Sequence, residues 1–317
     1  MSPARGHVIS HPYRVAVVGL GKIAIDQHVP AIASSTRFAL AAAVDSSPRS
    51  LSVPTFASMD ALLASGIALD AVAICTPPQV RAHIAERAID AGLAVMLEKP
   101  PATSVLELAA LARRADIKNV SLFAAWHSRH APMVPDALAW LEKRTLVSGH
   151  VRWREDVRKW HPGQRWLWQR GGLGVFDPGI NAFSILTALL PMMPVVARAH
   201  LDIPENAQTP IRAQLLLSAG GAPIEVELDF LETRSQQWEI HLESACGHSL
   251  RLIDGGTRLS IDGAQPVARP SAEYPALYAR FAELIASGSS EADDTPLALV
   301  ADALSVATID RVEPFSE

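Results

Sequence analysis

The sequence predicts an α/β protein with a doubly wound parallel sheet in its N-terminal part, followed by an α+β domain with a large, open, mostly antiparallel sheet. Two observations lead to this fold class. In the first part, short strands that are apolar throughout alternate with helical segments, as in a parallel sheet covered on both faces. From about residue 145 to 259, strand-like runs are separated by short polar or glycine-containing turns. Because 317 residues are enough for two cores, we place the domains at residues 1–127 and 128–317.

The N-terminal elements follow one another as strand, turn and helix. The expected strands lie at residues 14–18, 38–44, 71–75, 94–97 and 120–125, and the clearest helices at 80–91 and 104–115. In a doubly wound sheet, ligands bind where the strands end. The residues after each strand are therefore the first candidates for a site.

The C-terminal part mixes strands with three helices. We expect strands at 146–153, 211–217, 224–230, 238–242 and 250–253, and helices at 176–190, 272–287 and 297–312. The apolar stretch 182–199 contains Pro191 and Pro194, which favours a buried helix followed by a strand over a membrane span. An open sheet with one exposed face usually finds a partner, so we expect a homo-oligomer, a dimer through this sheet.

Composition and charge exclude several classes of function. The net charge is −5 and there is no basic stripe, which argues against nucleic-acid binding. Two cysteines, Cys75 and Cys246, are too few for a disulfide scaffold, and residues 1–11 lack the apolar segment of a signal peptide. We therefore expect a soluble, cytoplasmic protein that does not bind membranes.

The first strand runs into the loop Gly19-Leu20-Gly21-Lys22-Ile23-Ala24, which opens a helix. Glycine allows a tight bend and a close approach of the backbone to a pyrophosphate. Ala24 replaces the usual third glycine and is still small enough for close helix–strand packing. An ordinary βα turn is the alternative, but the strand before the loop and the helix after it favour a dinucleotide site.

Asp45 ends the second strand. A carboxylate at this place accepts the ribose hydroxyls of the adenosine half and repels a 2′-phosphate, which favours NAD over NADP. Arg49 nearby could weaken that preference. The alternative is that Asp45 is only a turn residue of the Asp-Ser-Ser-Pro run.

Glu98-Lys99-Pro100 follows another strand of the parallel sheet. A lysine there can donate to a substrate hydroxyl, or take its proton if burial lowers the lysine pKa. Pro100 is a candidate for a cis peptide bond. Taken alone, Lys99 could equally be a solvated residue at a strand end.

The run of residues 171–181 is the second informative stretch. Asp177 and Asn181 are four positions apart, so they share one face of a helix. Asp177 could instead be the N-cap of this helix, with Pro178 at its first position.

These motifs occur in one order along the chain: the GLGKIA loop, the EKP strand end and the D-x-x-x-N helix. Together they resemble the Gfo/Idh/MocA oxidoreductase family over nearly the whole chain. The resemblance implies an N-terminal Rossmann domain for NAD, with NADP as the weaker alternative, and a C-terminal α+β substrate domain. The family usually has histidine where this chain has Asn181, which removes one candidate base because an amide cannot take a proton.

Three runs resemble a narrower group of the family, and they lie at residues 125–129, 155–164 and 176–181. This group consists of bacterial dehydrogenases that oxidise the C1 hydroxyl of free D-galactose or L-arabinose to a lactone, with hydride transfer to NAD(P)⁺. The motifs do not choose between the two sugars, which differ by one exocyclic CH₂OH group.

The resemblance also implies site residues. Asp177 and Lys99 are candidates for the general base and its partner, and Asn181 would orient the C1 hydroxyl. A lysine beside a carboxylate is normally held charged, which favours Asp177 as the base, but the choice stays open. The residues expected to bind the sugar are Glu155, His161, Trp160, His127 and Trp238. The residues expected to contact the cofactor are Gly19, Gly21, Lys22, Ile23, Asp45, Thr76, Pro77, Glu98 and Lys99.

The sequence also bears on other functions. Asn181 argues against a polyol or inositol dehydrogenase on the same fold. Lys99 and Asp177 argue against a non-catalytic regulator that binds sugar and NAD, since a sensor would not need them. His127 and His130 are three apart, but no third ligand lies at metal-like spacing, so we expect no metal site.

Overall fold

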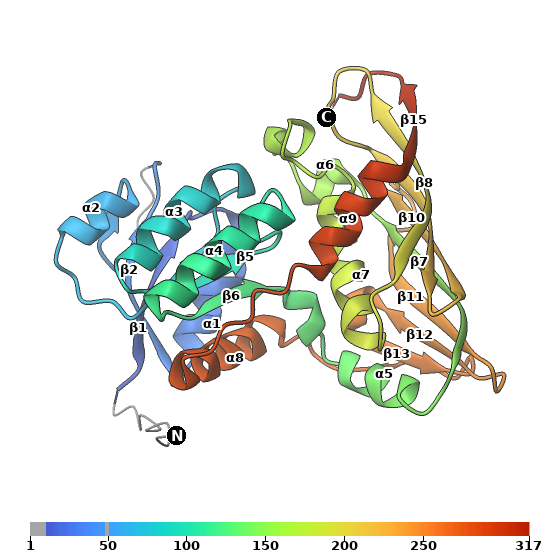
Figure 1. Ribbon diagram of the computed structural model, residues 1–317, viewed down its shortest axis with the longest axis horizontal. Helices are drawn as coiled ribbons and strands as arrows, with labels where there is room; N and C mark the ends of the chain where they lie inside the picture. Colours follow the sequence, from blue (N-terminus) through green and yellow to red (C-terminus); the bar gives the residue numbers. More distant parts are fainter. Residues whose placement is uncertain (1–10, 48–50, 317) are drawn as a thin grey trace. The chain divides into compact units, whose positions relative to one another are not determined.

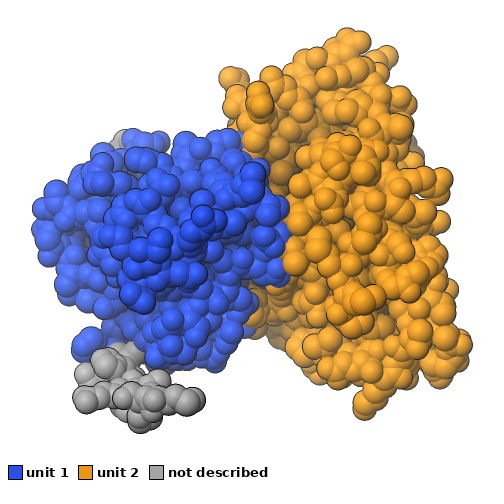
Figure 2. All heavy atoms as spheres, viewed as in Figure 1, with its two compact units in different colours: residues 1–126, 274–294 blue, residues 127–273, 295–317 orange. Residues whose placement is uncertain are grey.

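The computed structural model describes residues 11–47 and 51–316, and it divides into two compact units (Figure 2). The first unit contains the described residues up to Trp126 together with Tyr274–Asp294. The second contains His127–Glu273 and the described residues from Thr295 onward. The division after Trp126 lies next to the expected boundary. The placement of residues 274–294 in the second domain was wrong, because this segment packs in the first unit.

The first unit is built on a six-stranded parallel sheet with the order β3-β2-β1-β4-β5-β6 (Figure 1). This order confirms the predicted doubly wound sheet. Its strands are β1 (Tyr13–Val18), β2 (Phe38–Val44), β3 (Thr55–Phe56), β4 (Ala71–Ile74), β5 (Ala94–Glu98) and β6 (Leu122–Ala125). Its helices are the π-helix η1 (Ala24–His28), α1 (Val29–Ser34), α2 (Met59–Ala64), α3 (Pro78–Asp90), α4 (Val105–Lys118) and α8 (Glu273–Ser287).

Alternate residues of the parallel strands enter two separate cores, one on each face of the sheet. One core lies under α2, α3 and α4. The other lies under α1 and α8, and α8 contributes several of its aromatic rings. Phe281 is fully buried there and stacks on Phe38 at 5.7 Å and on Phe123 at 6.0 Å between ring centroids. The returning segment therefore completes the N-terminal fold.

The second unit contains a nine-stranded sheet with the order β14-β13-β12-β11-β7-β10-β9-β8-β15. Two neighbouring pairs, β7 with β10 and β8 with β15, are parallel and the others are antiparallel, as the sequence predicts for most of this sheet. The strands are β7 (Leu146–Arg154), β8 (Val195–Pro204), β9 (Arg212–Ala219), β10 (Ala222–Asp229), β11 (Gln237–Ser244), β12 (Ser249–Ile253), β13 (Arg258–Ile261), β14 (Val267–Ala268) and β15 (Ala307–Val312).

Three helices of this unit pack on the sheet: α5 (Val134–Leu141), α7 (Phe176–Leu189) and α9 (Thr295–Val306) (Figure 1). Short helices, α6 (Val157–Trp160) and two 3-10 segments (His127–His130 and Arg165–Trp168), lie in the connections. Within the described residues, no helix is long and apolar enough to cross a membrane.

The predicted helix at 297–312 was wrong in its second half. Helix α9 ends at Val306, and Ala307–Val312 forms β15, which pairs in parallel with β8. The run contains β-branched residues, among them Thr308, Ile309 and Val312, which favour a strand. Pairing also satisfies backbone groups at the edge of β8, and this tertiary contact decides between helix and strand.

Replacing Phe281 by alanine should lower the free energy of unfolding by about 3–5 kcal/mol, because a fully buried ring is lost from the core. Urea denaturation followed by circular dichroism measures the change. The control is Leu106→Ala, since Leu106 is 82 % exposed on α4 and should change stability by less than about 0.5 kcal/mol. A loss as small for Phe281→Ala as for the control would contradict the packing of residues 274–294 in the first unit.

Candidate active site

The loop after β1 leaves room for a ligand against its backbone. Gly19 has φ +88°, and a Cβ there would lie 2.9 Å from the backbone N of Thr76, so only glycine fits. A Cβ on Gly21 would have no atom within 4 Å, which leaves that side of the loop open. Ala24 is fully buried, as close packing requires, and the turn that follows is a π-helix before it continues as α1.

A cavity of about 560 Å³ lies at the carboxyl ends of β1, β2 and β4. Gly19, Gly21, Asp45, Thr76 and Pro77 are among its lining residues, so five of the residues expected for the cofactor meet here. Thr76 Oγ1 is buried and has no hydrogen-bond partner among the described residues. The volume, the open glycine and the available hydroxyl fit the adenosine and pyrophosphate parts of NAD.

Lys22 and Ile23 are not among the residues that line this cavity. Lys22 is exposed and forms an ion pair with Asp26 one helical turn later. A contact between either residue and the cofactor stays a prediction.

Asp45 has two roles within the chain. Its carboxylate accepts a hydrogen bond from the backbone N of Leu20 at 2.6 Å, which ties the glycine loop to the end of β2. It also accepts from the backbone N of Ser47 at 2.7 Å, the turn contact that the sequence offered as an alternative. A carboxylate has about four lone-pair sites, so it can still accept ribose hydroxyls from the cavity it lines. Arg49 lies outside the described residues.

The end of β5 carries Glu98 and Lys99, and the Lys99–Pro100 peptide bond is cis, as predicted. Lys99 is partly buried, and its backbone N donates to Glu98 Oε2 at 2.6 Å. Neither residue lines the 560 Å³ cavity. The buried guanidinium of Arg81, on α3, donates to the carbonyls of Glu98, Pro100 and Thr76. The backbone is therefore fixed at the residue before Lys99 and at the residue after it.

The second unit brings together five of the predicted residues. Glu155 is 4 % exposed and accepts from Trp238 Nε1 at 2.7 Å, while His161 Nε2 lies 2.9 Å from its other oxygen. His161 Nδ1 lies 3.9 Å from Asp177 Oδ2, which is also buried. One imidazole thus lies between two buried carboxylates. Trp160 belongs to the same group, since its ring meets the ring of Trp238 edge to face at 5.4 Å.

Helix α7 places Asp177 and Asn181 one turn apart on the same side. The N-cap of α7 is Val175, and Asp177 lies inside the first turn, so the interpretation of Asp177 as an N-cap was wrong. Gly179 allows α7 to lie close to β10, because a Cβ there would meet Leu228 Cδ1 at 2.5 Å. The helix start that carries Asp177 is therefore held against the sheet.

His127 is not part of this group. Its Nδ1 lies 2.5 Å from Glu273 Oε2, and both residues stand at points where the chain passes between the units. Trp126 Nε1 donates to the carbonyl of Asp293 at 2.8 Å, beside another of these points. The run 125–129 therefore has structural contacts, and a sugar contact by His127 stays a prediction.

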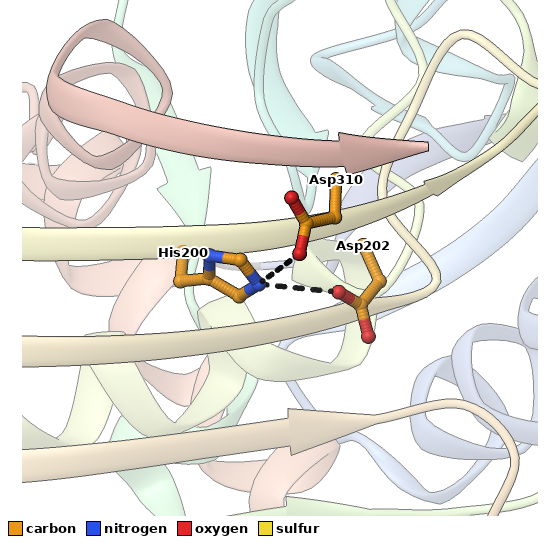
Figure 3. Close-up of side chains that lie close together, drawn as sticks. All are labelled: His200, Asp202 and Asp310. Carbon is orange, nitrogen blue, oxygen red and sulfur yellow. Dashed lines mark ion pairs between the residues drawn. The ribbon is translucent and has the colours of Figure 1, made fainter. Parts of the chain in front are cut away.

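Among the described residues, the side chains whose spacing could hold a metal ion are not His127 and His130 but His200, Asp202 and Asp310 (Figure 3). His200 Nε2 lies 3.4 Å from a carboxylate oxygen of Asp202 on the same strand, β8, and 3.4 Å from one of Asp310 on the neighbouring strand, β15. All three are at least partly exposed. Ion pairs within β8 and between β8 and β15 account for the arrangement, and the second of them helps to hold β15 on β8.

Sequence reasoning missed the residues that surround Glu98. His28, Tyr274 and Arg81 contact its carboxylate or its carbonyl, and all three are buried. His28 follows the glycine loop, but Tyr274 lies 176 positions away along the chain, so no local pattern signals the contact.

Comparison with known proteins decides the family. The model of the oxidoreductase family with an NAD-binding Rossmann fold, GFO_IDH_MocA, matches residues 13–125. A galactose 1-dehydrogenase from Pseudomonas fluorescens is 42 % identical over 305 residues, covering 96 % of this chain and 99 % of the relative. The chain belongs to the Gfo/Idh/MocA oxidoreductase family. As a member, it is an oxidoreductase whose Rossmann unit binds NAD.

Two solved structures have this fold. The crystal structure of a D-galactose-1-dehydrogenase protein from Rhizobium etli is 45 % identical, with a TM-score of 0.92 over 97 % of this chain and 99 % of that one. A 3-ketoreductase from Actinomadura kijaniata, crystallised with NADP, has a TM-score of 0.83 over 95 % of this chain and 100 % of its own. At 19 % identity, the second likeness shows the fold alone.

Replacing Asp45 by serine should shift cofactor preference toward NADP by about tenfold or more, since the carboxylate that repels a 2′-phosphate is lost. The measurement is the ratio of kcat/KM for NAD to kcat/KM for NADP. Asp45→Asn is the matched variant of nearly the same shape: it loses the charge but keeps one acceptor oxygen, and so one of the two bonds to the backbone N of Leu20 and Ser47. An unchanged ratio in both variants would refute the ribose role of Asp45.

Proposed function

We propose that this protein oxidises the C1 hydroxyl of free D-galactose to the lactone and passes the hydride to NAD⁺. The observation that carries the proposal is the match to galactose 1-dehydrogenases along almost the full length of both chains. The group around Glu155 and Asp177 supports it from the physical side. Buried carboxylate acceptors beside aromatic rings suit an uncharged ligand rich in hydroxyl groups.

Removal of the hydroxyl proton is assigned to Asp177. It is buried at the start of α7, and His161 lies 3.9 Å from it with Glu155 on the far side of the imidazole. This array can orient Asp177 and offer a path for the proton. Asn181, one turn along α7, would hold the C1 hydroxyl toward the carboxylate. When bound, NAD⁺ supplies the hydride acceptor.

Lys99 is assigned to the developing oxyanion. An ammonium group stabilises negative charge on the C1 oxygen as its proton leaves. Lys99 is also the alternative base, if its amine is neutral when substrate is bound. If Asp177 is the base, substitution of Asp177 abolishes proton removal. If Lys99 is the base, substitution of Lys99 does so.

The sugar ring is assigned to Glu155, His161, Trp160 and Trp238. Glu155 offers oxygens that accept from hydroxyl groups, and the indoles offer flat surfaces for the apolar face of the ring. L-arabinose is the second candidate substrate because it lacks only the exocyclic CH₂OH group. A pocket discriminates against one missing group of this kind by about 1–3 kcal/mol.

Assembly and location complete the proposal. We infer a cytoplasmic homodimer that associates through the face of the nine-stranded sheet carrying exposed side chains such as Arg152, Gln214 and Glu225. Both cysteines are free, which fits a reducing compartment. Light scattering coupled to size-exclusion chromatography should give twice the chain mass of 34.0 kDa, and a monomer would contradict the inference.

The activity is tested with NAD⁺ and a panel of aldoses, by following the absorbance of reduced nicotinamide. D-galactose should give the highest kcat/KM, L-arabinose a value within about two orders of magnitude of it, and glucose much less. Lactone formation is checked by its slow hydrolysis to the acid. No turnover with any aldose would overturn the proposed function.

Asp177→Asn should lower kcat by about 10²–10⁴-fold, because an isosteric amide cannot accept the proton. The Kd for NAD, measured by fluorescence quenching, should stay within twofold of the wild-type value. Asp202→Asn, on the nine-stranded sheet, is the control for the loss of one aspartate and should leave kcat unchanged. If Lys99→Met abolishes the burst of proton release while Asp177→Asn keeps it, Lys99 is the base. Equal loss of NAD binding in Asp177→Asn would mean that Asp177 acts only in the fold.

A further inference from the structure

A series of buried, hydrogen-bonded side chains, here called the polar chain, leads to the backbone of Lys99. It consists of Glu98, Tyr274, His28 and Tyr278. Glu98 accepts from the hydroxyl of Tyr274 at 2.6 Å and lies 3.2 Å from His28 Nε2. His28 Nδ1 in turn lies 2.9 Å from the hydroxyl of Tyr278. All four side chains are at most 5 % exposed, within the aromatic core under the parallel sheet. Glu98 connects this chain to the backbone of Lys99.

The charges in the polar chain are paired rather than isolated. Burial lowers the pKa of His28, but the interactions with Cys75, Tyr278 and Glu98 raise it by more than burial lowers it. The pKa of His28 therefore lies well above its usual value. The imidazolium can then donate from both nitrogens, to Glu98 and to Tyr278. Burial raises the pKa of Tyr278 to about 12, so its hydroxyl stays neutral.

An apolar core would fill the same space at lower cost. Taking a carboxylate and an imidazolium out of water is expensive even when they are paired, and replacement by packed apolar groups is often neutral or stabilising. The arrangement therefore needs a reason besides stability. The structure offers one such reason, which is the contact of Glu98 with the backbone of Lys99 at the end of β5.

We propose that Glu98 is a positioning residue for Lys99, and that Tyr274 and His28 hold Glu98 in place. The proposal rests on the proposed role of Lys99 in the oxidation. The carboxylate fixes the backbone N of Lys99, and Arg81 fixes the carbonyls of Glu98 and Pro100 on either side. Because the backbone of Lys99 is held at these points, its side chain always starts from the same position when it reaches toward the reacting oxygen. A displacement of that position should lower kcat more than it weakens substrate binding.

The first test is Tyr274→Phe, which keeps the ring and removes one donor to Glu98. It should lower kcat for D-galactose about tenfold, the typical effect of losing a hydrogen bond to a charged group. KM for the sugar and Kd for NAD should stay within twofold. Tyr278→Phe, one step further from Lys99, should have a smaller effect on kcat, and Glu98→Gln a larger one.

Tyr13→Phe is the matched control, since Tyr13 is a buried tyrosine of the same core and its ring lies 5.5 Å from the ring of Phe38, between centroids. It should leave kcat unchanged. Melting temperatures of all variants are measured in parallel. A fall in melting temperature without a fall in kcat for Tyr274→Phe and Glu98→Gln would show that the chain is structural and overturn the proposal. A joint loss of kcat and NAD affinity would also overturn it, since the chain would then shape the cofactor site.

A second readout does not depend on activity. Pro100 and Pro101 have no N–H, so two peptides that begin at the same upstream residue and end at Glu98 and at Pro101 differ only by the amide of Lys99. The difference in their deuterium uptake reports hydrogen exchange at that amide alone. Exchange at this amide should be at least tenfold faster in Tyr274→Phe and Glu98→Gln than in Tyr13→Phe. Unchanged exchange would overturn the positioning role. If the wild-type protein turns over no aldose while exchange responds as expected, the proposed function fails and the positioning of Lys99 stands.

Discussion

The hydrogen bond between Tyr274 and Glu98 joins the two parts of the chain that make up the first unit. Glu98 ends β5, and Tyr274 lies in the first turn of α8, where the chain returns from the second unit. A buried carboxylate is stable only when donors surround it, so this contact and that of His28 constrain where α8 and η1 can lie. The aromatic core, the turn at the end of β5 and the backbone of Lys99 all depend on it.

The second unit also contains a buried carboxylate that needs hydrogen-bond donors, and different residues supply them. Glu155 is a buried carboxylate held by the N–H of an aromatic side chain, Trp238, much as Glu98 is held by the O–H of Tyr274. The second oxygen of Glu155 faces His161, and His161 also faces Asp177. In each unit, polar aromatic side chains stabilise charge in a dry environment without adding charge of their own.

Local chemistry explains which parts of the fold could be predicted from the sequence. The parallel strands, the glycine loop and the cis bond before Pro100 each depend on a few neighbouring residues, and the structure confirms them. The segment 274–294 and the strand β15 could not be assigned correctly, because their partners are long-range. For the same reason Glu155 and His161 were identified only through resemblance, and Tyr274 and His28 were missed. No pattern along the chain records that a tyrosine 176 positions away reaches Glu98.

The return of α8 to the first unit has a consequence for biosynthesis. A ribosome releases residues 11–126 long before it releases Tyr278 and Phe281, which complete the core on one face of the parallel sheet. Until then, Phe38 and Phe123 lack their stacking partner, and a nascent chain in this state presents an aromatic surface to its surroundings. The second unit has to emerge almost entirely before the first can close, so the order of synthesis and the order of completed folding are reversed for part of this protein.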